Sequence, residues 1–109
     1  MDRRKYPRTK ACIPIEIHVR HPEGTEEPWI GRGAVANLSL TGILFFPDNH
    51  PPIKQGDIRD FTFTPAHPIE GLPRALFIKA RGKVVRIEII EFYQSLGVAV
   101  DFLTGPYFG

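Results

Sequence analysis

The sequence has a single cysteine, Cys12, and no long hydrophobic run. One cysteine excludes an intramolecular disulfide and a zinc site built from cysteines. No stretch approaches the roughly 20 apolar residues that span a bilayer. The basic N-terminus is not followed by the apolar segment of a signal peptide. We therefore expect a protein of the reducing cytoplasm, without membrane insertion and without a metal site.

Extremes of length and of charge are also missing. The 109 residues are enough for one domain and too few for two. Hydrophobic residues make up 42% of the chain and the formal net charge is only +2, which excludes disorder throughout the chain and a generally basic surface. The basic residues are concentrated instead, since five of the fourteen lie within residues 3–10. This concentration favours a local anion site in the N-terminal arm.

Candidate catalytic groups show no arrangement typical of an enzyme. Ser39 lacks the Gly-x-Ser-x-Gly context of an activated nucleophile, and the carboxylates are scattered along the chain. The histidines lie on the polar face of a strand or in proline-rich loops: His18, His21, His50 and His67. We therefore expect a binding protein with no catalytic residues and no cofactor.

Alternating hydrophobic residues predict strands along most of the chain. In residues 13–20, isoleucines and a valine at the odd positions share one face, and mainly polar residues occupy the other. Further strands are expected over residues 29–38, 43–46, 56–63, 75–91 and 96–102, with Gly82 as a natural site for a bulge. No window repeats apolar residues at helical spacing. Because closure removes exposed strand edges, the sequence predicts an all-β, six-stranded antiparallel barrel over residues 13–103. Residues 1–12 would form a flexible basic arm, and residues 104–109 a C-terminal tail.

One candidate ligand motif lies in the arm, where Arg4 and Arg8 are separated by three residues. The planar fork of donors on arginine matches a guanine edge or a phosphate. By itself, however, this motif is more typical of a solvated basic tail, because basic N-terminal runs are frequent.

A second candidate motif follows the second expected strand, where Asn37, Ser39 and Gly42 form a turn. The two polar side chains offer hydrogen bonds, and glycine permits either a close approach or a positive φ. Leu38 and Leu40 flank the polar residues and are expected to dock into the barrel. Taken alone, this motif is better explained as an ordinary β-turn.

In this order and spacing, the two motifs resemble the signature of the PilZ domain family, a bacterial receptor module for cyclic di-GMP. That signature is Arg-x-x-x-Arg followed by Asp/Asn-x-Ser-x-x-Gly. Residues 81–86 and 96–102 are similar to the family's later strands, so the resemblance covers essentially the whole chain. It implies a six-stranded barrel whose arm folds over the nucleotide. The implied contacts are Arg4 and Arg8 on guanine bases and phosphates, Asn37 and Ser39 on guanine edges, clearance at Gly42, and an added phosphate contact from Arg3.

The function implied by the resemblance is a single-domain receptor or adaptor that binds cyclic di-GMP and signals to an unidentified partner protein. A PilZ-like adaptor that binds a protein and no nucleotide stays open, and so does a small RNA- or single-stranded-DNA-binding barrel. For the last, less favoured alternative, Lys79, Arg81 and Lys83 share one strand face and could follow a phosphate backbone. The sequence does not distinguish a monomer from a homodimer. Tyr107 and Phe108 are candidates to cover one end of the barrel.

Overall fold

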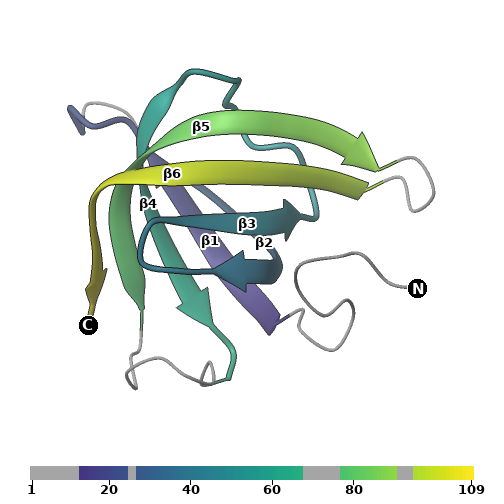
Figure 1. The fold of residues 1–109 in the computed structure, drawn as a ribbon, viewed down its shortest axis with the longest axis horizontal. Coiled ribbons are helices and arrows are strands. Elements are labelled where there is room, and N and C mark those ends of the chain that lie inside the picture. Colours follow the sequence, from purple (N-terminus) through teal and green to yellow (C-terminus); the bar gives the residue numbers. More distant parts are fainter. Residues whose placement is uncertain (1–12, 25–26, 68–76, 91–94) are drawn as a thin grey trace.

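The computed structural model describes residues 13–24, 27–67, 77–90 and 95–109. Six strands close into a barrel in the order β1-β2-β3-β6-β5-β4, and every neighbouring pair is antiparallel (Figure 1). The predicted all-β, six-stranded antiparallel barrel is therefore confirmed. No helix capable of crossing a membrane is found in these parts of the chain. The strands are β1 (Ile13–Arg20), β2 (Trp29–Leu38), β3 (Gly42–Pro47), β4 (Ile58–Pro65), β5 (Ile78–Ile90) and β6 (Ser95–Phe108).

Strand β1 shows how the alternation in the sequence becomes the wall of the barrel. Ile15, Ile17 and Val19 are buried, whereas the residues between them are exposed or half-buried. Paired residues on antiparallel strands share a face, so the inward residues of β1 lie opposite Gly33, Gly31 and Trp29 on β2. Each strand thereby contributes one face to a common interior.

Three phenylalanines fill the centre of that interior. Phe45 comes from β3, and Phe61 and Phe63 come from β4, strands that are three places apart in a ring of six and so face each other. The Phe45 ring meets the Phe63 ring edge-on at 5.2 Å, and the Phe61 and Phe63 rings stack at 5.8 Å. All three side chains are at most 1% exposed. The rings therefore connect opposite walls of the barrel.

Strands β5 and β6 form the longest pair, and both are irregular. The register shifts next to Arg81 and Gly82, which confirms the bulge expected at Gly82. Strand β6 continues to Phe108, beyond the predicted barrel end at residue 103, and it bends before it reaches the C-terminus (Figure 1). Gly105 has a φ of 97° and interrupts the alternation of inward and outward residues along β6. Because that alternation is the signal by which a strand is found in a sequence, the last part of β6 was not predicted. At the end of the strand Phe108 packs against the core, whereas Tyr107 is 60% exposed.

Candidate ligand-binding site

The turn between β2 and β3 is organised by the side chain of Ser39. The Ser39 backbone N–H donates to the carbonyl oxygen of Gly42 at 3.0 Å, which closes the turn. The Thr41 backbone N–H donates to Ser39 Oγ at 3.1 Å, and Ser39 Oγ lies 3.1 Å from Thr41 Oγ1. A serine hydroxyl that accepts from the backbone N–H two residues later in this way stabilises a turn. Both hydroxyl groups stay exposed, so they are also accessible to a ligand.

Asn37 points outward because β2 contains one extra residue. Val35 pairs with Phe45 and Asn37 pairs with Leu44, so Ala36 has no opposite residue on β3. Strict alternation from the buried Val35 would turn Asn37 inward. The bulge instead exposes the Asn37 side chain, as bulges commonly re-aim side chains near sites.

Leu38 and Leu40 differ in their surroundings, contrary to the expectation that both dock into the barrel. Leu38 packs against the core, because the bulge at Ala36 turns it inward. Leu40 is 69% exposed, so its predicted burial is wrong. It lies at the tip of a turn that the bond between Ser39 and Gly42 closes behind it, which keeps it away from the interior.

Gly42 is required by the neighbouring strand. A Cβ at this position would lie 2.6 Å from the carbonyl oxygen of Val100 on β6, and Gly42 does not adopt a positive φ. Of the two reasons anticipated for this glycine, close approach is therefore the one that applies. The approaching group is the β6 backbone, and the predicted clearance for a ligand stays a prediction.

A row of outward-facing side chains, here called the platform, follows the curved outer wall of the barrel beside the turn. Strand pairing places Asn37, Leu44, Ala99 and Arg86 in one row across four strands, from β2 to β5. In the adjacent row the half-buried Phe46 ring lies against Gly97, where an added Cβ would be only 3.3 Å from Phe46 Cε1. The platform is thus apolar at its centre and polar at both ends.

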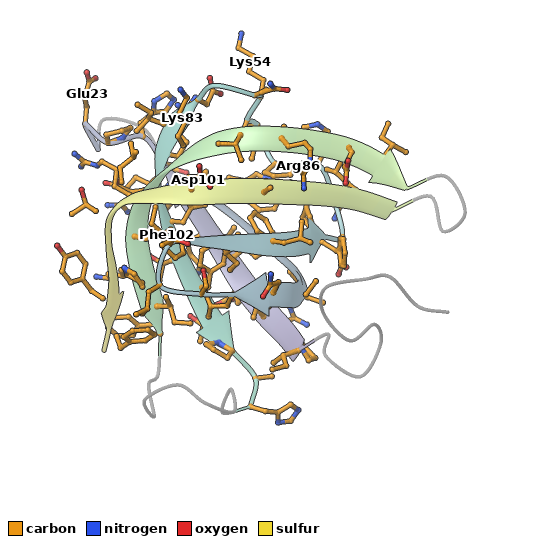
Figure 2. The ribbon with its side chains drawn as sticks, in the orientation of Figure 1. Glu23, Lys54, Lys83, Arg86, Asp101 and Phe102 are labelled. Carbon is orange, nitrogen blue, oxygen red and sulfur yellow. The ribbon has the colours of Figure 1, made fainter. Side chains whose placement is uncertain are left out.

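Arg86 is a site candidate that the analysis of the sequence missed. A register shift between Val84 and Arg86 turns this arginine outward, although Val84 two residues earlier is fully buried. Arg86 Nε lies 3.5 Å from Glu88 Oε2, and both side chains are more than half exposed. Such an exposed pair contributes little, so the guanidinium is available to a ligand. Figure 2 shows Arg86 on β5 and Asp101 on the adjacent β6.

The structure thus brings together Asn37, Ser39 and Gly42, the three site residues predicted in the turn. Arg3, Arg4 and Arg8 lie outside the described residues, so their predicted clamp stays a prediction. Within the described ranges, no group of three or more histidine, cysteine, aspartate or glutamate side chains is arranged to hold a metal ion.

The class that the structure defines is a small, closed, six-stranded antiparallel β-barrel with an exposed polar turn between β2 and β3. A protein-family model of the PilZ domain matches residues 2–106, a range that includes both motifs. The chain therefore belongs to the PilZ domain family, whose members are cyclic di-GMP receptor and adaptor modules. Neither the curated proteins nor the solved structures contain a significant match.

Proposed function

We propose that this protein binds cyclic di-GMP on the outer wall of the barrel, between the β2–β3 turn and Arg86, and acts as a single-domain receptor that signals to a partner protein. The observation that carries the proposal is the row from Asn37 to Arg86, which sets an amide and a guanidinium at opposite ends of an apolar platform. Family membership supports the identity of the ligand.

The chemistry of cyclic di-GMP suits this arrangement. Its guanine bases have flat faces, and Phe46 and Leu44 provide apolar surface on which a base can stack. The Asn37 amide carries both donors and acceptors, as does a guanine edge. Each phosphate carries a negative charge that Arg86 can neutralise with charge-assisted hydrogen bonds. The platform would thus provide base contacts at one end and a phosphate contact at the other.

The arm supplies the second half of the proposed site. Arg4 and Arg8 would contact the nucleotide from the side that faces away from the barrel, and Arg3 would add a phosphate contact. Closure of the arm over the ligand would change the surface presented to a partner, which is a common way for ligand binding to be transmitted. The protein needs no catalytic group for this function.

Titration calorimetry with purified protein tests this proposal through Arg86. Arg86→Ala should weaken cyclic di-GMP binding about 10- to 150-fold, because a hydrogen bond to a charged group contributes about 1.5–3 kcal/mol. Lys83→Ala is the matched control: it removes a positive charge from the outer face of the same strand, outside the platform row. Equal losses in both variants would contradict a specific phosphate contact. No heat with folded wild-type protein would favour the adaptor that binds no nucleotide.

Ser39→Ala separates the ligand role of the turn from its structural role. The hydroxyl accepts one exposed backbone hydrogen bond that water can replace, so the free energy of unfolding should fall by no more than about 1 kcal/mol. The affinity for cyclic di-GMP should fall less than in the arginine variants. Urea unfolding and calorimetry on the same sample check both values. Loss of the folded barrel would show that Ser39 is mainly structural.

A further inference from the structure

A concave surface lies on the outer wall away from the platform. It is a groove of about 670 Å³ formed by β1, β4, β5 and the C-terminal part of β6. The strand pairing arranges the residues that line the groove in rows. One row across these strands consists of Arg20, Asp60, Arg81 and Thr104. A parallel row runs through His18, Thr62, Lys79 and Tyr107. The described residues that line the groove include none from the β2–β3 turn or from the platform.

The groove carries more positive charge than its own acid can neutralise. Arg81 donates from Nε and Nη2 to the two carboxylate oxygens of Asp60, at 2.7 and 3.2 Å. This carboxylate raises the pKa of Arg81 above its ordinary value, and the pair is neutral overall. Among the described residues that line the groove, Asp60 is the only acid.

Two further cations in the groove therefore lack a carboxylate. The Arg20 side chain makes no hydrogen bond or ion pair with any residue in the described ranges, and Lys79 Nζ lies over the Phe77 ring, 5.2 Å from its centroid. Both side chains are exposed. Arg20 lies next to Asp60 in the first row, and Lys79 lies two residues from Arg81 on β5, in the second row. A ligand whose negative charges are separated by a similar distance would be complementary to these two cations.

The shape of the groove favours an extended polypeptide. Four adjacent strands span three intervals of about 4.8 Å, a distance of about 14 Å, which corresponds to about four extended residues. Small ligands usually have most of their surface buried in an enclosed pocket, whereas this groove is partly open to solvent and runs across the strands. Tyr107, 60% exposed at one end of its row, offers apolar surface and a hydroxyl.

We propose that this groove binds an acidic, extended segment of a partner protein, with carboxylates on Arg20 and Lys79 and an apolar side chain against Tyr107. The proposal rests on the adaptor part of the proposed function, and it names the chemistry of the partner. Nucleic acid fits less well because Asp60 lies in the middle of the groove and its described lining offers only one exposed aromatic ring for base stacking. Strand β6 borders both sites, since the Phe102 N–H donates to the Thr41 carbonyl in the turn and Thr104 lines the groove.

Fluorescence anisotropy with a defined probe tests the proposal on the full chain. The probe is a fluorescein-labelled ten-residue peptide in which glutamates alternate with serine and leucine, and its counterpart carries glutamines instead. At low ionic strength the acidic peptide should bind and the neutral one should not. Arg20→Gln combined with Lys79→Gln should weaken binding about tenfold, as expected for two partly exposed ion pairs. Lys83→Gln, the matched control on the same strand, should change it less than twofold.

Three results would overturn the proposal. The first is no binding of the acidic peptide by folded protein, and the second is an equal loss in the double variant and in Lys83→Gln, which would indicate only diffuse charge. The third is preferential binding of a labelled oligothymidylate of the same length that the double variant abolishes, which would make the groove a nucleic-acid surface. Cyclic di-GMP titrations on the same samples distinguish the two sites. Loss of peptide binding in the groove variant should leave the affinity for the nucleotide unchanged, and Arg86→Ala should leave the affinity for the peptide unchanged.

Discussion

Replacement of Arg8 by alanine should weaken cyclic di-GMP binding by about 1–3 kcal/mol, or about 5- to 150-fold, and Arg4→Ala should have a similar effect. Each arginine can direct two parallel donors at the O6/N7 edge of a guanine or at a phosphate, and alanine removes both contacts. Calorimetry measures the affinity, and the circular dichroism spectrum should stay that of the folded barrel.

Lys5 offers a matched control because it lies between the two arginines and carries the same charge. Lys5→Ala should change the affinity much less, since lysine is a point charge without the planar fork. Equal losses of affinity in the lysine and arginine variants would show that the arm contributes only nonspecific electrostatic attraction. Unchanged affinity in Arg4→Ala and Arg8→Ala alike would remove the arm from the mechanism.

Of the substitutions proposed here, Phe45→Ala should lower the free energy of unfolding most, by about 3–5 kcal/mol, because it leaves a cavity at the centre of the barrel. The Phe45 ring is fully buried and contacts Phe63 and Phe61 edge-on, at 5.2 and 6.3 Å. Those two rings come from the opposite wall, so the cavity cannot close without moving whole strands. A domain of this size is stable by only about 5–15 kcal/mol, so the loss is a large part of the total. Urea unfolding should show a lower midpoint with an unchanged slope.

Leu40→Ala is the control for this substitution. Leu40 is also a large hydrophobic residue, but it is 69% exposed in the turn, so the free energy of unfolding should change by no more than about 0.5 kcal/mol. A loss below about 1 kcal/mol for Phe45→Ala would contradict the central role of the three rings. Binding of cyclic di-GMP by the folded fraction of Phe45→Ala should persist, because this side chain lies inside the barrel and outside the proposed site.

The sequence was most informative where the alternation of residues was regular. The inward set of β1 and the shared face of Phe61 and Phe63 could be predicted because a strand has a period of two and one face must be buried. The same rule failed where strands carry an extra residue. The bulge at Ala36 reverses the orientation of Asn37, and the shift before Arg86 turns that side chain outward.

The chain by itself therefore determined the fold class, most of the core-facing residues and the two motifs of the PilZ signature, because these depend on local patterns. Which strands are neighbours depends on long-range pairing in the folded chain, which places β6 between β3 and β5. Both candidate surfaces depend on that order. Asn37 and Arg86 share the platform, and Arg20 and Arg81 share the groove, although each pair is far apart in sequence. The physical reason is that alternation specifies the face of a strand, whereas backbone hydrogen bonds and bulges set the register that brings distant side chains together.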